Sequence, residues 1–344
     1  ISRKEAAKRI GAGDPPMLCH GPATARRLGI DPFPAYDLLE LFAFVRPAAF
    51  CIPTPRGLAD ALGLDSGTDG PPDLAAAVLI LRRASIRLLS ELSEESVGRP
   101  ARRVAQAMMR GGWSWGATVL RALNVEPEEK MRAPANGLEV WREIPEWSEH
   151  APPPPPGSAS VDPAEARARL ADLLDASSEA RPSQADYASA ATGAFVPRDT
   201  PGEPHFVLAE AGTGVGKTLG YLAPASVWAE KNEAPVWIST YTRNLQHQID
   251  QELDRLFPDP RVKSNRVVVR KGRENYLCLL NMQDAVRGVG VRQHDAIALG
   301  LMARWAAHSR DGSVTGGDFP SWLVDLLGTR RTLALTDHRG ECIY

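Results

Sequence analysis

Disulfide scaffolds, membrane spans and an overall basic charge are all missing from this sequence. It holds 4 cysteines in 344 residues, too few for a disulfide framework, so a reducing compartment, the cytoplasm, is expected. No stretch offers the roughly 18 apolar residues that a membrane-spanning helix needs. The 40 Lys and Arg residues are balanced by 42 Asp and Glu residues. Any nucleic-acid surface must therefore be a local patch.

The chain is long enough for about two domains, and one run of prolines divides it. Pro152–Pro156 is followed by the small residues 157–160. Such a run favours an extended polyproline conformation that neither a helix nor a central strand can continue. We therefore predict a linker over residues 151–161, with an exposed loop inside one domain as the alternative. Residue 1 is Ile rather than Met, and residues 339–344 carry no helix-stop signal, so we expect the chain to be part of a longer polypeptide.

Strand and helix patterns alternate after the predicted linker. The pattern predicts strands at His205–Ala211, Pro235–Thr240 and Arg266–Arg270, with helices at Gly216–Glu230 and Arg243–Phe257 between them. Such alternation indicates a parallel sheet with right-handed crossovers, and so an α/β fold over residues 162–275. From residue 276 the pattern becomes mostly helical, which indicates an insertion over residues 276–344.

The strongest chemical signal is a glycine-rich loop between the first predicted strand and the first predicted helix. It reads Ala211-Gly212-Thr213-Gly214-Val215-Gly216-Lys217-Thr218, the pattern of a phosphate-binding P-loop with Ala211 in place of the first glycine. Backbone N–H groups of such a loop surround phosphate oxygens, helped by the N-terminus of the following helix. Lys217 would contact the β- and γ-phosphates of ATP, and the Thr218 hydroxyl would bind Mg²⁺. A flexible glycine loop with an incidental lysine is the alternative.

A stretch of basic residues without any acid follows the second predicted helix. It covers residues 261–273 and would give salt-dependent, sequence-independent affinity for DNA. A solvated charged loop is the alternative. The basic residues are Arg261, Lys263, Arg266, Arg270, Lys271 and Arg273.

Four short blocks besides the P-loop, in the order in which they occur, indicate a family. They are Arg181-Pro182-Ser183-Gln184, Ser239-Thr240-Tyr241-Thr242-Arg243-Asn244-Leu245-Gln246, Lys271-Gly272-Arg273-Glu274-Asn275-Tyr276-Leu277-Cys278 and Arg339-Gly340-Glu341-Cys342. Residues 181–344 thereby resemble the DinG/XPD-type superfamily 2 DNA helicases, specifically the bacterial DinG-like branch. The resemblance implies a RecA-like P-loop sheet, here an incomplete first motor lobe, interrupted by a helical iron–sulfur insertion.

The resemblance also implies roles for residues in these blocks. Gln184 matches the glutamine that reads adenine; an exposed polar helix residue is the alternative. Thr242 would also cap a helix, which is compatible with contact to DNA. Residues that we expect to contact the backbone of single-stranded DNA are Thr240, Thr242, Arg243, Gln246, Arg270, Lys271 and Arg273.

Two cysteines match cluster ligands of the related helicases. Cys278 and Cys342 correspond to the first and second of four cysteines that hold a [4Fe–4S] cluster, which needs four thiolates. The other two ligands are expected beyond the chain end. By spacing alone, two cysteines so far apart are more often buried or incidental.

By resemblance, the whole protein is an ATP-dependent DNA helicase. It would move 5′→3′ on single-stranded DNA and unwind forked or other duplex DNA during repair, as a monomer. The sequence has no acidic Walker-B tetrad after the third predicted strand and no second motor domain with an arginine finger. The chain alone should therefore bind ATP weakly and hydrolyse it negligibly. The alternatives are a P-loop ATPase or kinase that does not act on nucleic acid, and a stand-alone module that binds ATP or DNA.

Residues 1–150 give fewer signals. Segments Leu18–Ala25, Tyr36–Leu41 and Gly57–Leu64 resemble a DnaQ-type 3′–5′ exonuclease, an α+β fold that some DinG-like helicases carry ahead of the motor. Ala25 stands where that family has its second-motif aspartate, although the reaction needs acidic residues to hold two metal ions. We expect a degenerate, non-catalytic module, with an unrelated helical domain as the alternative.

Overall fold

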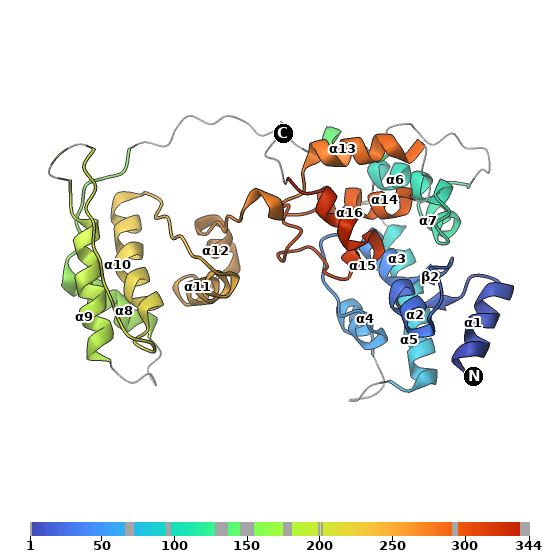
Figure 1. Ribbon diagram of the computed structural model, residues 1–344, viewed down its shortest axis with the longest axis horizontal. Helices are drawn as coiled ribbons and strands as arrows, with labels where there is room; N and C mark the ends of the chain where they lie inside the picture. The colour runs from blue at the N-terminus through green and yellow to red at the C-terminus, as the bar shows by residue number, and fades with distance from the viewer. Residues whose placement is uncertain are drawn as a thin grey trace. The chain divides into compact units, whose positions relative to one another are not determined.

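The chain divides into two compact units. The computed structural model describes residues 2–65, 72–93, 98–127, 137–144, 155–174, 181–198, 200, 202–290 and 295–337. Unit 1 combines residues 1–147 with residues 271–344, and unit 2 is residues 148–270 (Figure 1). The segment after residue 270 therefore shares a unit with the N-terminal half of the chain.

The described part of unit 1 is mostly helical. Its small parallel sheet pairs β1 (Met17–Leu18) with β2 (Tyr36–Asp37), with Met17 opposite Tyr36 and Leu18 opposite Asp37. Its helices are α1 (Arg3–Ala12), α2 (Gly21–Leu28), α3 (Leu38–Val45), α4 (Pro55–Leu62), α5 (Leu74–Leu92), α6 (Gly98–Arg110), α7 (Gly116–Ala122), α13 (Leu279–Arg287), α14 (Asp295–Ala306), α15 (Leu323–Leu327) and α16 (Thr329–Ala334), with 3₁₀ turns η2 (Val140–Arg142), η4 (Arg273–Asn275) and η5 (Gly288–Gly290).

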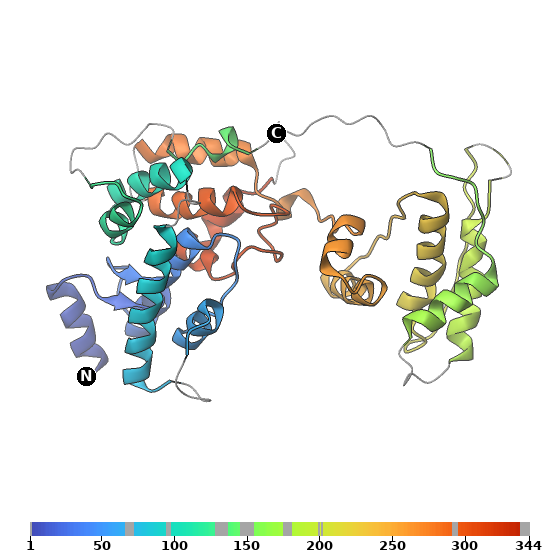
Figure 2. The same cartoon turned by 180° about the vertical axis from the view of Figure 1, so that it is seen from behind.

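One hydrophobic core joins the two segments of unit 1. Helix α14 packs against α6 and α3, so the orange and red helices lie on the blue and teal ones in Figure 1 and, from behind, in Figure 2. Gly300 permits this approach, because a Cβ there would collide with Cγ of Met108 on α6. Two polar contacts fix the packing: Arg304 Nε donates to the carbonyl oxygen of Phe44 at 3.0 Å, and Trp322 Nε1 donates to that of Cys51 at 3.1 Å.

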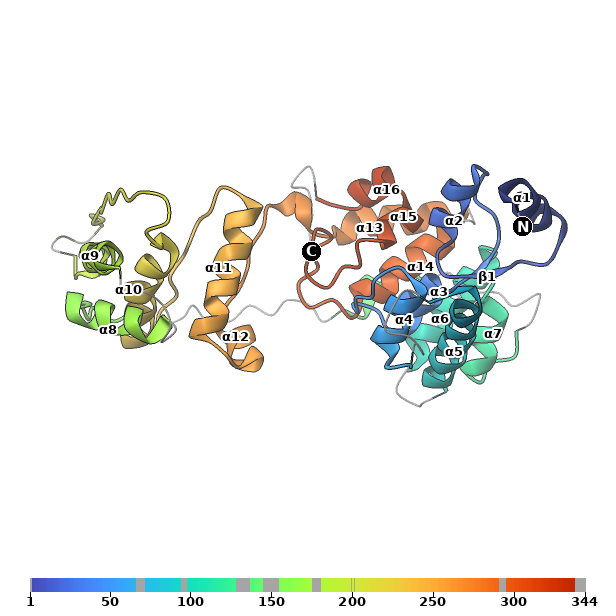
Figure 3. The same ribbon diagram turned by 90° about the horizontal axis from the view of Figure 1, so that it is seen from below.

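Unit 2 contains α8 (Pro163–Leu173), α9 (Pro182–Ala191), η3 (Thr192–Phe195), α10 (Lys217–Asn232), α11 (Arg243–Leu256) and α12 (Pro260–Arg266). Helices α8, α9 and α10 pack on one another, and Figure 3 shows α9 end-on beside the other two. Helix α8 begins at a capping box in which Asp162 and Glu165 satisfy each other's backbone N–H groups. The predicted linker begins outside the described residues, but its later part is tied to the end of α10, since Asn232 exchanges hydrogen bonds with Ala159.

The prediction of three strands after the linker is wrong for the described residues. Residues 205–211 and 235–240 lie outside any helix or strand, and Arg266 is the last residue of α12 rather than the first of a strand. No backbone hydrogen bond joins these segments to one another among the described residues. A parallel strand forms only against a partner that pairs its N–H and C=O groups, and this part of the chain offers none. Asp259 instead caps α12 with Pro260 in its first turn, which favours a helix there.

The predicted α/β class is supported only in general terms. The described chain is helix-rich with a small parallel sheet, which is compatible with an α/β fold, but the sheet belongs to unit 1, whereas the P-loop belongs to unit 2. None of the described helices combines the length and apolarity that crossing a membrane would take.

Candidate nucleotide and nucleic-acid site

The P-loop leads directly into α10. Lys217 is the first residue of that helix, and Gly216 caps it in the left-handed conformation with φ of 85°. Gly214 also has a positive φ, 81°, which glycine adopts without the steric cost that other residues meet. A Cβ at Gly212 or Gly214 would meet nothing within 4 Å. The loop therefore has open space at the Cβ positions of these two glycines.

The amine of Lys217 contacts its own loop. It donates hydrogen bonds to the carbonyl oxygens of Ala211 at 2.8 Å and Gly212 at 2.9 Å. The positive charge of Lys217 is thus held over the loop by two backbone carbonyl oxygens.

Two side chains at the start of α9 also contact the loop. Gln184, only 4% exposed, donates through Nε2 to the carbonyl oxygen of Gly216 at 2.8 Å. Arg181, just before α9, donates through Nη1 to that of Gly214 at 2.6 Å. The interpretation of Gln184 as an exposed helix residue is therefore wrong. Its adenine-reading role stays a prediction. The sequence placed Arg181 in a family block but gave it no role.

Thr218, the predicted Mg²⁺ ligand, is half-buried on the first turn of α10. Its side chain hydrogen-bonds with Tyr221, one turn along the helix. Burial raises the pKa of Tyr221, and the bond with Thr218 opposes that rise. Lys217 and Thr218 thus lie side by side at the helix start, as a P-loop requires.

Four predicted DNA contacts lie around the start of α11. Thr242 is the N-cap, and its hydroxyl oxygen accepts a hydrogen bond from the N–H of Leu245 at 3.2 Å. Gln246 Nε2 donates to the carbonyl oxygen of Arg270 at 3.3 Å. The structure therefore brings Gln246 and Arg270 together across 24 residues of sequence. Arg243 is the first residue of α11, and Thr240 lies half-buried just before it.

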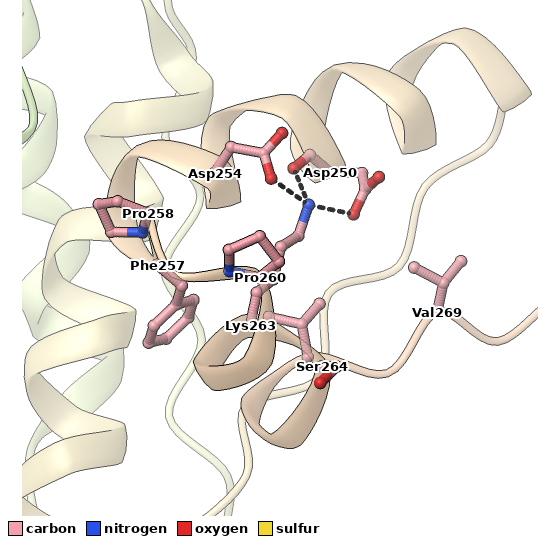
Figure 4. Close-up of a pocket in the computed structure, with 9 residues that line it drawn as sticks. Asp250, Asp254, Phe257, Pro258, Pro260, Lys263, Ser264 and Val269 are labelled. Carbon is pink, nitrogen blue, oxygen red and sulfur yellow. Dashed lines mark hydrogen bonds and ion pairs between the residues drawn. The ribbon is translucent and has the colours of Figure 1, made fainter. Parts of the chain in front are cut away.

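The basic stretch 261–273 is less uniform than its sequence indicates. The amine of Lys263 lies between Asp250 and Asp254, at 2.9 Å and 2.7 Å from their carboxylates (Figure 4). Burial lowers the pKa of Lys263, but the hydrogen bonds to the two aspartates outweigh it and raise the pKa. These residues line a cavity of about 210 Å³ between α11 and α12. The charge of Lys263 is therefore neutralised inside the helix pair.

Lys271 is also engaged, in unit 1. Its amine donates to Ser313 Oγ and to the carbonyl oxygen of Thr315, both at 2.8 Å. The basic side chains of this stretch that remain exposed are Arg261, Arg266, Arg270 and Arg273. The patch expected from sequence thus keeps its arginines on the surface, while both of its lysines turn to other partners.

Cys278 is buried at 2% exposure, just before α13. Its N–H donates to the carbonyl oxygen of Leu335 at 2.8 Å, and an isolated bridge pairs Leu277 with Thr336. The second predicted ligand, Cys342, lies outside the described residues. Within the described ranges no three His, Cys, Asp or Glu side chains gather as a metal site would require. One cysteine of the four that a cluster needs is thus present there, and by itself it does not make the site.

In the N-terminal half, the buried carboxylate of Asp37 is held by backbone N–H groups. Oδ2 accepts from Gly21 at 2.5 Å, and Oδ1 accepts from Leu39 at 2.8 Å and Glu40 at 3.3 Å. Burial raises the pKa of Asp37 to about 6, against these hydrogen bonds. Burial and the charge of Asp37 raise the pKa of Glu40 as well. Asp37 thus caps α3, and Ala25 is a buried core residue of α2.

The chain is similar over part of its length to several curated proteins. A protein from Bacillus subtilis (strain 168) named 3'-5' exonuclease DinG is 33% identical over 118 residues, which cover 33% of this chain and 12% of that protein. ATP-dependent helicase DinG from Mycobacterium tuberculosis (strain ATCC 25177 / H37Ra) is 41% identical over 86 residues, covering 24% and 13% respectively. ATP-dependent DNA helicase YoaA from Haemophilus influenzae (strain ATCC 51907 / DSM 11121 / KW20 / Rd) is 35% identical over 113 residues, covering 32% and 17%.

The matched segments therefore make up less than a fifth of each of these relatives. No family model matches the chain. No solved structure matches it.

Proposed function

Because the chain is a partial match to the DinG-like helicase family, we propose that it is part of an ATP-dependent DNA helicase, with the sites for ATP and single-stranded DNA in unit 2. The P-loop is the observation that carries the proposal. Lys217 is the first residue of α10, and its amine donates hydrogen bonds to carbonyl oxygens of the loop. Arg181 and Gln184 donate hydrogen bonds to other carbonyl oxygens of the same loop. Such a loop suits a triphosphate, and the matched relatives are named as ATP-dependent helicases.

Bound ATP supplies the free energy of transferring its γ-phosphoryl group to water, and the residues bind and position it. Lys217 would exchange the carbonyl oxygens of Ala211 and Gly212 for the β- and γ-phosphates. Thr218 would hold Mg²⁺ through its hydroxyl. Gln184 would read the adenine edge, since an amide can both donate and accept. We expect the chain alone to bind ATP weakly and hydrolyse it negligibly.

Single-stranded DNA would bind at the start of α11, with forked or other duplex DNA as the substrate of the whole protein. Thr240, Thr242, Arg243 and Gln246 offer hydroxyl, guanidinium and amide groups to the phosphate backbone. Arg270 would add positive charge. For Lys271 and Arg273, which belong to unit 1, contact with DNA stays a prediction from the family resemblance. We expect 5′→3′ movement, a monomer and a role in repair, by analogy with the family.

The fold of the nucleotide-binding part would be RecA-like. Support comes from exposed apolar side chains before α10, of which Phe206 is 84% exposed, since the parallel sheet of such a fold would cover side chains of this kind.

An iron–sulfur cluster would be held by Cys278 and Cys342 with two further cysteines. The support is that Leu335 and Thr336, a few residues before Cys342, lie directly beside Cys278. Four thiolates would then bind the [4Fe–4S] group. Spectra of the longer protein with Cys278→Ser would test the assignment, because a cluster with absorbance unchanged by that substitution would contradict it.

The N-terminal half would be a non-catalytic relative of the DnaQ-type fold. One matched protein is named an exonuclease, but the side chain of Ala25 cannot bind a metal ion. Both carboxylate oxygens of Asp37 accept hydrogen bonds from backbone N–H groups. We expect no degradation of single-stranded DNA by the chain in the presence of Mg²⁺ or Mn²⁺. Measurable degradation that depends on the metal would contradict this.

Coupling between ATP and DNA binding tests the proposed function. If both ligands bind unit 2 as proposed, oligo(dT) should change the affinity of the chain for a fluorescent ATP analogue, and the analogue should change the affinity for oligo(dT) by the same factor. A P-loop ATPase or kinase unrelated to nucleic acid would bind the analogue without any response to oligo(dT). Failure to bind oligo(dT) at all would refute the DNA-binding half of the proposal.

A further inference from the structure

One segment of unit 1 carries arginine as its only charged residue type. Residues 98–125 contain five arginines and no Asp, Glu or Lys. Helix α6 lies in this segment and packs on α14 and α7 (Figure 1). Within α6, Arg102, Gln106 and Arg110 follow one another at every fourth position. Side chains four residues apart lie one above another on the same face of a helix, so these three residues form a row.

This arginine row, Arg102, Gln106 and Arg110, lies on the surface. The face of α6 that enters the core consists of small and apolar residues, namely Ala101, Val104, Ala105 and Met108. On the other face Arg102 and Arg110 are exposed, and Gln106 between them is half-buried. A rise of 1.5 Å per residue spreads the row over about 12 Å. Two guanidinium groups can therefore reach one extended anion.

The residues around the row leave its charge positive. Arg102 forms no ion pair within the described ranges of the chain. Arg103, beside the row, lies 3.2 Å from the carboxylate of Glu143, and a pair so exposed to solvent holds its partners only weakly. Arg121, on the neighbouring helix α7, is exposed as well. The surface thus combines several arginines with one nearby carboxylate.

The chemistry of the arginine row fits phosphate better than it fits protein. A guanidinium group donates two parallel hydrogen bonds to phosphate oxygens, and a glutamine amide can donate another. A protein interface normally has an apolar centre. Among the described residues, none of the large hydrophobic side chains that are exposed belongs to α6 or α7. Met109 is not offered to a partner, because it lies against Gly116 at the start of α7.

The surface favours a duplex over a single strand. Sites for single-stranded DNA combine cations with aromatic rings on which the bases stack. The aromatic residues that follow α6, Trp113 and Trp115, are both buried at 3% exposure. A duplex presents its phosphates at regular intervals of about 3.4 Å along each strand. A row of about 12 Å therefore spans three or four phosphates of one strand.

We propose that the arginine row of α6 binds the phosphate backbone of duplex DNA. The inference rests on the proposed function, because duplex DNA is the substrate of a helicase. It adds a second DNA-binding surface, in unit 1, to the contacts with single-stranded DNA proposed at the start of α11. Because the row meets phosphates rather than base edges, its binding depends on salt and not on sequence.

Removal of the two arginine charges gives the direct test. The affinity of the 344-residue chain for a fluorescein-labelled, blunt-ended DNA duplex would be measured by anisotropy at several salt concentrations between about 50 and 200 mM. Arg102→Gln combined with Arg110→Gln should weaken binding about 10- to 100-fold at the lowest salt concentration. The slope of log affinity against log salt should become less steep by about 2. Duplexes of different sequence should respond alike.

Two further pairs of substitutions separate the row from charge in general. Arg102→Lys combined with Arg110→Lys keeps both charges, so the salt dependence and most of the affinity should remain. Arg27→Gln combined with Arg330→Gln removes the same charge from exposed positions on α2 and α16. This matched control should bind the duplex within about twofold of the unaltered chain. Circular dichroism would verify that each variant is folded.

Oligo(dT) distinguishes failure of the inference from failure of the proposed function. The Arg102→Gln, Arg110→Gln chain should bind oligo(dT) as the unaltered chain does. Oligo(dT) binding without any duplex binding, or duplex binding that falls no more than in the matched control, would overturn the inference and leave the proposed function standing. Equal losses for duplex and oligo(dT) would overturn the assignment of the row to duplex DNA. A chain that binds neither probe would overturn both.

Discussion

The contact between Gly216 and Gln184 gives the sharpest prediction about the P-loop. In Gly216→Ala the new Cβ would collide with Nε2 of Gln184 and lie 2.8 Å from its Cδ. Gln184 is buried and cannot swing into solvent without losing its hydrogen bond to the carbonyl oxygen of Gly216. The φ of 85° at this position also disfavours any residue with a side chain.

The two costs are separate and can be added. A left-handed conformation costs a non-glycine residue about 1–2 kcal/mol. Loss of a partly buried hydrogen bond costs about 1–2 kcal/mol more. The packing of α9 on α10 should therefore lose about 2–4 kcal/mol, which corresponds to a fall of roughly 30-fold or more in the protection of their amides from hydrogen exchange.

Hydrogen exchange read by mass spectrometry on peptides from α9 and α10 measures this loss without requiring that both units unfold together. Gly212→Ala is the matched control, because its Cβ would meet nothing within 4 Å, and its effect should stay within about 0.5 kcal/mol. In a chain that already carries Gln184→Ala, Gly216→Ala should cost only the free energy of the left-handed conformation. The effects of the two substitutions should therefore differ from additivity by about 1–2 kcal/mol. Equal protection in Gly216→Ala and Gly212→Ala would refute the reasoning.

Three further predictions concern other parts of the chain. The pKa of Asp37 is about 6 in the folded chain and about 3.9 in the unfolded chain, so the stability of the folded chain falls as the pH rises from about 4 to 6. Asp37→Asn lacks this titration, so its free energy of unfolding, relative to that of the unaltered chain, should rise by on the order of 1–3 kcal/mol across the same pH range. Urea unfolding measures both free energies, and a difference that does not change with pH would contradict this. Gly300→Ala should destabilise unit 1 by about 1–3 kcal/mol, because its Cβ would lie 2.6 Å from Sδ of Met108, and an unchanged thermal midpoint would contradict that packing. Lys263→Ala should leave oligo(dT) affinity within about twofold, because Asp250 and Asp254 already neutralise Lys263; a loss as large as that of Arg270→Gln would show that Lys263 contacts the DNA.

Local signals predicted the helices around the candidate site well. The helix after the P-loop begins at Lys217, one residue after its predicted start, and the next begins at Arg243 behind the cap Thr242, as predicted. Both starts depend on residues that are neighbours in sequence, a glycine loop in one case and a hydroxyl cap in the other.

Contacts between distant residues were beyond the sequence patterns. An acid-free basic stretch does not indicate that α11 and α12 fold against each other and bring Asp250 and Asp254 to Lys263. Nor does the helical pattern after residue 276 indicate that α14 packs on α6 and α3. The strands were expected from apolar runs, but a run becomes a strand only with a partner to pair with.

Binding of ATP by Lys217 is the central claim, and titration calorimetry with Mg²⁺ and ATP tests it most directly. The chain should bind one ATP weakly, and Lys217→Ala should abolish measurable binding, because the β- and γ-phosphates would lose their charged partner. Lys8→Ala, an exposed lysine on α1, should bind ATP as the unaltered chain does. Undiminished ATP affinity in Lys217→Ala would contradict the assignment of this loop as the nucleotide site.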